Sequence, residues 1–189
     1  MVSDFILGIF AFYFFYMNMA VNKNWGFFFL FVSIAAFVGS AFHGGYIAAE
    51  YARFVPWTIL SASLIFAQLA TYEEVNSKVL NTFFVFKSAL FLSLAISYSE
   101  FLFMITDIAI SLLGFVVIGN SFFIKGISNK ISLGIMISIS SAIIVVLKLN
   151  IHPEYLTAND IGHYISIISL LYISKGIGES SYYLKLKQV

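Results

Sequence analysis

The sequence predicts an all-α, polytopic membrane protein: a seven-transmembrane helix bundle that forms a single domain over residues 1–189. The first observation is composition, because 61% of the residues are hydrophobic and only 10% are charged. Soluble domains carry about 25% charged residues, and one of this length could not bury so much apolar surface. The second observation is that the apolar residues form continuous runs between short polar breaks. Continuous runs favour membrane-spanning helices over the short alternating segments of a β-barrel.

Seven runs approach the length of about 20 mainly apolar residues that a spanning helix needs. In chain order they are residues 5–20, 25–49, 56–71, 79–98, 101–124, 131–149 and 158–177. No basic segment or small-residue cleavage pattern accompanies the first run, so we expect it to be retained. The break at Ser99 and Glu100 is so short that the fourth and fifth runs should form an antiparallel hairpin.

Basic residues near the ends of the runs predict the orientation. With seven spans, one side of the membrane receives Lys23, Lys78, Lys125, Lys130, Lys175, Lys185 and Lys187. The other side receives only Arg53 and Lys148. Lysine and arginine concentrate on the cytoplasmic side, so we expect an external N-terminus and a cytoplasmic C-terminus. The expected location is the inner (plasma) membrane of a bacterium.

Composition also excludes several classes of function. The absence of cysteine excludes disulfide frameworks, thiolate metal sites and cysteine nucleophiles. A net charge of +1 provides no basic surface for nucleic acid. The polar breaks are too short for an extramembrane domain, so a substrate or partner should meet the bundle itself or the surrounding lipid. We expect membrane lipid to be both substrate and solvent, and the sequence does not identify protein partners.

The predicted orientation places most titratable residues at the outer side of the bundle. His43 lies near the end of the second run, while Asp160 and His163 begin the seventh, and Asp107 lies in the outer part of the fifth. At 1.5 Å per residue these groups share a layer roughly 10 Å thick. Nearby on the same side are Glu50, His152 and Glu154. Ionisable residues inside a membrane span are costly and mark functional sites, so the layer predicts one site.

Residue types in this layer are compatible with a zinc site. Asp160 and His163 are spaced i, i+3 and share a helix face, as do Ser40 and His43. We expect His43, Asp160 and His163 to hold Zn²⁺ with an open position for water. The metal would lower the pKa of that water to about 7. Asp107 would then move the proton, and the Ser40 hydroxyl would stabilise the oxyanion.

Each of these residues also has a structural interpretation. Lys87 lies deep in the fourth run, so a Lys87–Asp107 ion pair across the hairpin is as well supported as a catalytic Asp107. Asp160 is suited to bind free backbone N–H groups in the first helical turn, with Asn159 or Thr157 as the cap. His43 is suited to an interhelical hydrogen bond, and His152, next to Pro153, to the surface.

Ser40 before His43 in the second run, and His163 early in the seventh, resemble the motifs of the CREST superfamily. These seven-span membrane proteins include the alkaline ceramidases and the progestin/adiponectin-receptor-type proteins. The resemblance implies an intramembrane zinc protein of which several relatives hydrolyse amide bonds in lipids. It also implies that His43 matches the ligand of span two and His163 the second ligand of span seven.

The sequence departs from that superfamily at three positions. The pattern has a serine four residues before the histidine of span two, where this chain has Gly39. It has a second histidine four residues before His163, where this chain has Asn159. The third span lacks aspartate, so that role would fall to Asp107 or Glu50.

Three functions follow from these observations. The first is a zinc-dependent intramembrane hydrolase that cleaves an amide or ester bond of a membrane lipid entering sideways between helices. The second is a small transporter or proton-coupled channel that uses the polar layer as a relay. The third is a non-catalytic assembly subunit in which the polar layer joins helices.

Overall fold

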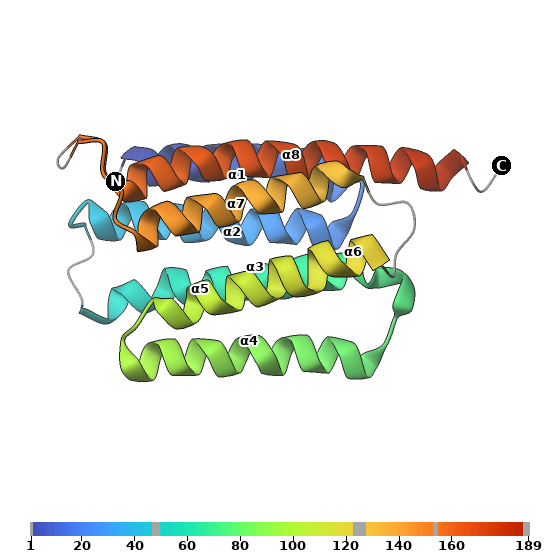
Figure 1. Ribbon diagram of the computed structural model, residues 1–189, viewed down its shortest axis with the longest axis horizontal. Coiled ribbons are helices and arrows are strands. Elements are labelled where there is room, and N and C mark those ends of the chain that lie inside the picture. Colours follow the sequence, from blue (N-terminus) through green and yellow to red (C-terminus); the bar gives the residue numbers. More distant parts are fainter. Residues whose placement is uncertain (1, 47–49, 123–127, 153–154, 187–189) are drawn as a thin grey trace.

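A computed structural model describes residues 2–46, 50–122, 128–152 and 155–186, and over these ranges the chain forms helices and no strand. The long helical segments, which we call rods, pack side by side (Figure 1). The helices are α1 (Val2–Met19), α2 (Lys23–His43), η1 (Glu50–Arg53), α3 (Phe54–Thr71), η2 (Glu73–Val75), α4 (Lys78–Tyr98), α5 (Leu102–Ala109), η3 (Ile110–Val117), α6 (Ile118–Phe122), α7 (Asn129–Val146) and α8 (Ala158–Leu186). Segments α5, η3 and α6 follow one another without a break, and η3 is a π-helix.

Side-chain caps explain where several helices begin. Asn22 accepts a hydrogen bond from the Trp25 N–H at the start of α2, and Ser77 accepts one from Leu80 at the start of α4. Ser128 does the same for α7. Such caps satisfy backbone donors that have no partner within the helix. Ser99 ends α4 with a φ of 56°, which produces the tight turn expected between the fourth and fifth runs.

The seven predicted runs correspond to the rods, with four differences of three residues or more at their ends. Helix α1 begins at Val2, three residues before the predicted run, and α8 continues to Leu186 instead of ending at 177. Helix α7 ends at Val146, three residues before the predicted end at 149. Helix α2 ends at His43 rather than at 49, because Gly44 caps it and Gly45 has a φ of 75°. Residues 47–49 lie outside the described ranges.

Five of the described helices are long and apolar enough to cross a membrane: α1, α2, α3, α4 and α7. The segment Leu102–Val117 is apolar but shorter. Large side chains project outward from α4, where Val79 is 81% and Phe86 is 67% exposed. Such a surface is suited to contact with lipid, and the long apolar helices fit an integral membrane protein.

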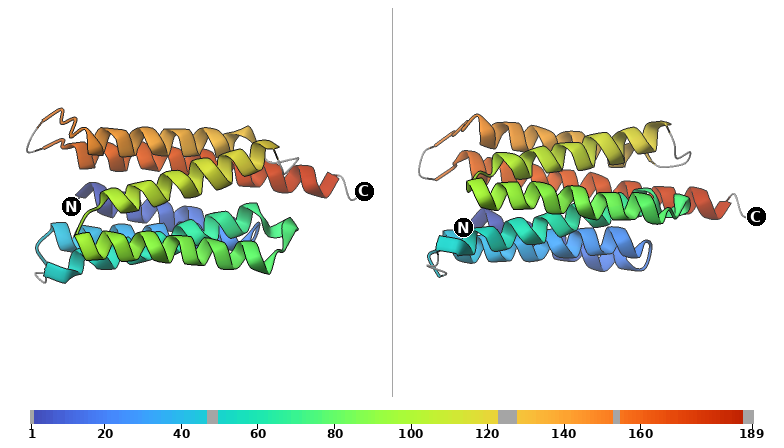
Figure 2. Two further views of the ribbon diagram at one scale, coloured as in Figure 1. Left: turned by 60° about the horizontal axis from the view of Figure 1, so that its bottom comes forward. Right: turned by 90° about the horizontal axis from the view of Figure 1, so that it is seen from below.

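Small residues allow α7 and α8 to approach closely, as two further views show (Figure 2). A methyl group at Gly134 would lie 2.8 Å from the Ser169 carbonyl oxygen, and one at Gly176 would lie 2.7 Å from the Ile131 nitrogen. Packing of backbone against backbone at small residues is the usual means of joining helices in a membrane. Close packing against α7 holds α8 in place, and α8 carries two of the predicted site residues, Asp160 and His163.

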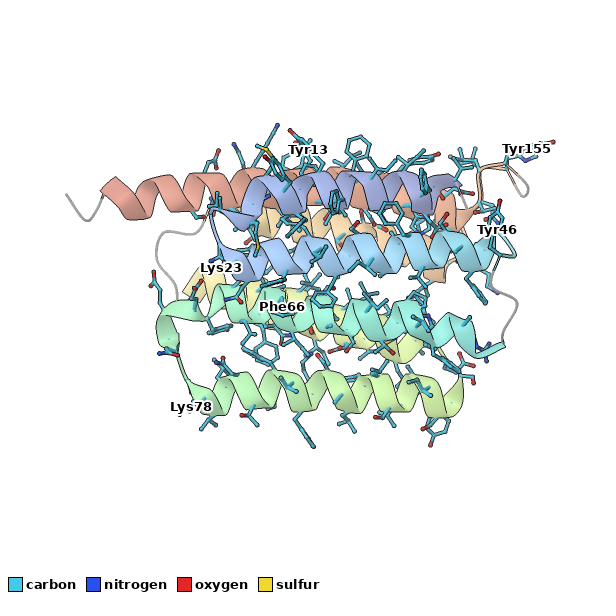
Figure 3. All side chains as sticks on the ribbon, turned by 180° about the vertical axis from the view of Figure 1, so that it is seen from behind. Tyr13, Lys23, Tyr46, Phe66, Lys78 and Tyr155 are labelled. Atoms are coloured by element: carbon cyan, nitrogen blue, oxygen red, sulfur yellow. The ribbon has the colours of Figure 1, made fainter. Side chains whose placement is uncertain are left out.

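Successive rods run in opposite directions, so α1, α3, α5 and α8 begin at the end of the bundle where α2, α4 and α7 finish. We call this the N-terminal end of the bundle. Tyr46 and Tyr155 lie at this end, whereas Lys23 and Lys78 lie at the opposite one (Figure 3). The alternation therefore brings the start of α1 beside the start of α8 and the end of α2.

Candidate functional site

Five polar residues meet at the N-terminal end of the bundle, and we call them the end cluster: Ser3, Asp4, Thr157, Asp160 and His163. The Ser3 hydroxyl donates to Asp160 Oδ1 over 2.5 Å and lies 3.0 Å from His163 Nδ1. On the other side of the ring, His163 Nε2 lies 3.3 Å from Asp4 Oδ1. The imidazole therefore stands between a carboxylate and a hydroxyl that is bonded to a second carboxylate.

A continuous row of hydrogen bonds through the end cluster would need one more proton than Ser3 and a neutral imidazole supply. Three contacts join Asp160, Ser3, His163 and Asp4 in a row: the first two are hydrogen-bond contacts, and the third is an ion-pair contact between His163 Nε2 and Asp4 Oδ1. Ser3 supplies one proton and a neutral imidazole supplies one. A third proton, carried by the His163 ring, would complete the row.

Asp160 also closes the first turn of α8. Its Oδ2 accepts from the backbone N–H of Thr157 over 3.0 Å and from the Thr157 hydroxyl over 2.7 Å. The Thr157 hydroxyl in turn accepts from the Asp160 N–H over 3.3 Å. This reciprocal pattern is a capping box, and it confirms the structural interpretation of Asp160 as a first-turn carboxylate with Thr157 as the cap.

The end cluster is largely enclosed, with one open edge. Ser3 is 1% and Asp4 5% exposed, whereas the His163 side chain is 25% exposed. Helix α2 covers Asp4, since a methyl group at Gly39 would lie 3.4 Å from Asp4 Oδ1. Ser40, the predicted oxyanion donor, is the next residue on α2 and is buried. Exchange with water is therefore open at His163 and at Asp160, which are both partly exposed, and closed at Ser3 and Asp4.

The predicted zinc ligands are not arranged as a metal site. His43 is exposed at the end of α2, with its ring against Phe42. His163 and Asp160 direct their polar atoms at Ser3, Asp4 and Thr157, as described above. Among the described residues no group of three His, Asp or Glu side chains is placed to hold a metal ion. As arranged, these residues do not fit zinc.

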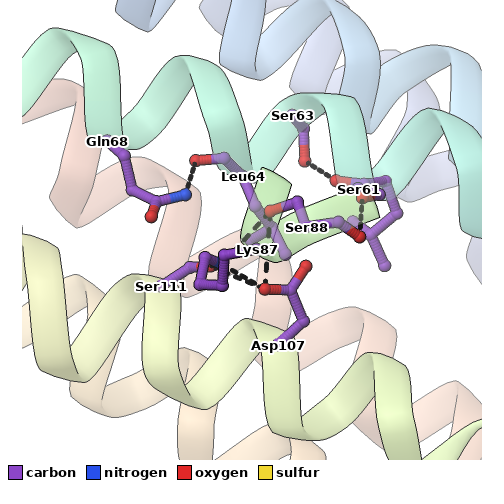
Figure 4. A network of polar contacts seen from close by, with 9 residues as sticks. Ser61, Ser63, Leu64, Gln68, Lys87, Ser88, Asp107 and Ser111 are labelled. Carbon is purple, nitrogen blue, oxygen red and sulfur yellow. Dashed lines mark hydrogen bonds and ion pairs between the residues drawn. The ribbon is translucent and has the colours of Figure 1, made fainter. Parts of the chain in front are cut away.

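A second polar centre lies between α4 and α5–η3, and we call it the pair cluster: Lys87, Ser88, Asp107 and Ser111 (Figure 4). Lys87 Nζ forms an ion pair with Asp107 Oδ1. It also donates to Ser88 Oγ over 3.1 Å and to Ser111 Oγ over 2.5 Å. Asp107 is completely buried and Lys87 is 6% exposed. The Lys87–Asp107 ion pair, one of the two alternatives that the sequence offered for Asp107, is therefore present.

The pair cluster and the end cluster lie on different sides of the bundle. Helix α4 lies along one side in Figure 1, and α1 and α8 lie along the opposite side. Asp107 makes its hydrogen bonds to the other members of the pair cluster. Its predicted role as a proton shuttle for a zinc-bound water remains a prediction, without a contact that joins it to His43 or His163.

A family model matches residues 1–181 of this chain. The chain belongs to DUF6962, a family of unknown function. No curated protein and no solved structure matches the DUF6962 chain. The two polar clusters, rather than a relative, therefore carry the functional argument for this DUF6962 member.

Sequence reasoning missed two members of the end cluster, Ser3 and Asp4. The predicted first span began at Phe5, which left both residues outside the membrane and outside the predicted layer. A partial signal was available, because alternating spans place the start of the first helix at the same end of the bundle as the start of the seventh. His152, in contrast, is exposed and accepts from the Tyr155 N–H over 3.2 Å, which confirms its interpretation as a surface residue.

Proposed function

We propose that this protein is a seven-span membrane protein that passes protons through the end cluster, as a proton-coupled transporter or channel. One observation supports this function above the others: a row of close polar contacts runs from Asp160 through Ser3 and His163 to Asp4, with an imidazole inside the row. Histidine changes its charge near neutral pH, and its two ring nitrogens exchange protons with different partners. An imidazole between two carboxylates is therefore suited to receive a proton on one side and release it on the other.

Burial indicates where protons enter and leave: Asp160 and the His163 side chain are partly exposed at the N-terminal end of the bundle, whereas Ser3 and Asp4 are buried. A proton on His163 moves from Nε2 to Asp4, or along the row when Nδ1 gives its proton to Ser3 and Ser3 gives its own to Asp160. Once Asp160 has released that proton to water, rotation of the Ser3 hydroxyl toward Asp160 and uptake of a new proton by His163 return the row to its starting arrangement. No step requires a heavy atom to leave its position.

Polar side chains continue along α8 toward the other end of the bundle. Ser141 donates to the Gly162 carbonyl over 2.8 Å and lies 3.1 Å from Ser166 Oγ. Farther along, Asn18 donates to Ser174 Oγ over 2.7 Å. Hydroxyl and amide groups at helix contacts tolerate water and transfer hydrogen bonds where an aliphatic core would not. These are separate polar contacts with buried apolar side chains such as Leu170 and Ile173 between them, so a proton route across the bundle would need water to join them.

Proton flux into vesicles tests the proposal. Purified protein is reconstituted in liposomes with an internal pH dye, and a potassium diffusion potential drives proton entry. We expect wild-type protein to acidify the vesicles and His163→Ala to reduce the rate by about 100-fold, because the central carrier is lost. The matched control is His152→Ala, which removes an exposed histidine outside the end cluster. Equal rates for the two variants would show that protons do not pass through His163.

The proposed seven-span topology can be tested directly because the natural chain contains no cysteine. Single cysteines are introduced at Tyr46, Tyr155 and Glu74, which are all exposed. Seven spans with an external N-terminus place the first two outside and Glu74 inside. We expect a membrane-impermeant maleimide to label Tyr46→Cys and Tyr155→Cys in intact cells, and Glu74→Cys only after lysis. Labelling of all three from outside would contradict the topology.

A zinc-dependent lipid hydrolase is the second candidate function. The observation that favours it is the position of His43 at the last residue of α2, which ends at the same end of the bundle where α8, with Asp160 and His163, begins. Zinc binding would require Ser3 and Asp4 to release His163 and Asp160. Retention of one zinc per chain, lost in both His43→Ala and His163→Ala, would favour hydrolysis of a membrane lipid over proton transfer. An assembly subunit would show neither bound zinc nor proton flux.

A further inference from the structure

The two carboxylate oxygens of Asp160 serve different helices. Oδ1 accepts from the Ser3 hydroxyl of α1 over 2.5 Å. Oδ2 accepts twice from Thr157 at the start of α8, from its hydroxyl over 2.7 Å and from its backbone N–H over 3.0 Å. One carboxylate therefore belongs both to the proton row and to the cap of α8. The division of its two oxygens determines which of them can receive a proton from Ser3.

The Thr157 hydroxyl makes one contact more than a capping box requires. In a capping box the hydroxyl accepts from the third helical N–H, and the side chain at that third position accepts from the backbone N–H of the cap. Both bonds are present here, the first from the Asp160 N–H and the second from the Thr157 N–H. The hydroxyl also donates its own proton to Asp160 Oδ2. Neither backbone N–H needs this third bond for its partner, so its effect is on the carboxylate.

The backbone around Thr157 is fixed on both sides. Before it, His152 and Leu156 form an isolated antiparallel β-bridge, with hydrogen bonds of 3.1 Å and 3.2 Å. After it, the Ala158 N–H donates to Asn150 Oδ1 over 2.7 Å. These contacts hold the start of α8 independently of the Asp160 carboxylate. The Thr157 hydroxyl therefore starts from a defined position when it binds Oδ2.

The Asp160 carboxylate would turn more freely without the Thr157 hydroxyl. The terminal torsion of an aspartate is broad and roughly twofold, and Asp160 is partly exposed, so water can compete for its oxygens. Only the Thr157 backbone N–H would then hold Oδ2. Ser3 is 1% exposed and cannot follow a carboxylate that turns toward water. A displacement of about 1 Å at a reacting group is sufficient to slow a reaction by about 100-fold.

We propose that Thr157 is a positioning residue for proton transfer: its hydroxyl holds Asp160 Oδ2, so that Oδ1 faces Ser3 and receives the proton. In this step the Ser3 O–H bond breaks as an O–H bond forms at Oδ1, and Ser3 takes a replacement proton from His163 Nδ1. Thr157 keeps its own proton throughout. The role rests on the proposed function, because a carboxylate that passes no protons needs no such orientation.

Proton entry into vesicles tests this role. Thr157→Val removes the hydroxyl but keeps the branched shape, and we expect a rate about tenfold below wild type. Thr157→Gly should show the same loss, and because glycine also caps helices well it serves if Thr157→Val does not fold. Thr157→Ser keeps the hydroxyl and should restore the rate to within about twofold. The matched control is Asn150→Ala, which removes another acceptor from the start of α8 and should retain the wild-type rate.

A double variant separates positioning from a general loss of structure. Because Thr157 is proposed to act through the contact between Asp160 and Ser3, Thr157→Val should not lower the flux further once Ser3→Ala has removed that contact. A further loss of about tenfold in the double variant would overturn the role, as would equal flux in Thr157→Val and Asn150→Ala. Either result with normal wild-type flux would overturn the positioning role alone. Wild-type protein that passes no protons would overturn the proposed function, and the role of Thr157 with it.

Discussion

Replacement of Asp107 by asparagine is expected to lower the free energy of unfolding by about 3–5 kcal/mol. The substitution preserves size but removes the negative charge that Lys87 contacts. Lys87 is 6% exposed, so its ammonium would remain buried with only hydroxyl and amide acceptors. Breaking a buried pair by removing one partner is costly because the other charge is left uncompensated. Thermal or detergent-induced unfolding of the purified variant measures the loss.

A second substitution separates charge from packing at the pair cluster. Addition of Lys87→Met to Asp107→Asn removes the uncompensated ammonium, and we expect it to restore most of the lost stability. Thr106→Ala is the matched control, since Thr106 precedes Asp107 but is directed to the outside of α5, where it bonds only to the Leu102 carbonyl. A double variant as unstable as Asp107→Asn alone would show that the buried charge is not the cause.

Replacement of Ser3 by alanine is expected to reduce proton flux at least about tenfold. Ser3 is the only group that joins Asp160 to His163 in the row, so its removal divides the row in two. The matched variant is Ser33→Ala: Ser33 is also 1% exposed, and it donates one hydrogen bond, to the Gly8 carbonyl. Each variant loses a buried hydroxyl, at a cost of about 1 kcal/mol, so unfolding measurements should show similar stability while vesicle assays show different flux.

The helices were predictable because each one is determined by the residues of a single continuous segment. A run of apolar residues between polar breaks determines where a spanning helix lies, and α3 and α4 begin and end within two residues of their predicted runs. The Lys87–Asp107 pair was predictable for the same reason, because the tight turn at Ser99 fixes the hairpin that brings them together. The positions of the apolar runs and the length of the turn between them are sufficient to predict such contacts.

The end cluster could not be predicted fully, because it depends on which distant helices become neighbours. Apolar runs indicate that α1 and α8 start at the same end of the bundle, but not that they are adjacent. That adjacency places Ser3 between Asp160 and His163, positions more than 150 residues away in the chain. The same lack of long-range information made His43 appear to be a ligand, whereas the end of α2 at Gly44 leaves its side chain exposed.

The most direct test of proton transfer through the end cluster is the rate of proton entry into vesicles that carry Ser3→Ala, measured against vesicles that carry Ser33→Ala. Both variants lose one buried hydroxyl, but only Ser3 belongs to the row between Asp160 and Asp4. We predict that Ser33→Ala retains the wild-type rate and that Ser3→Ala falls at least about tenfold below it. Equal proton entry through the two variants would contradict the relay.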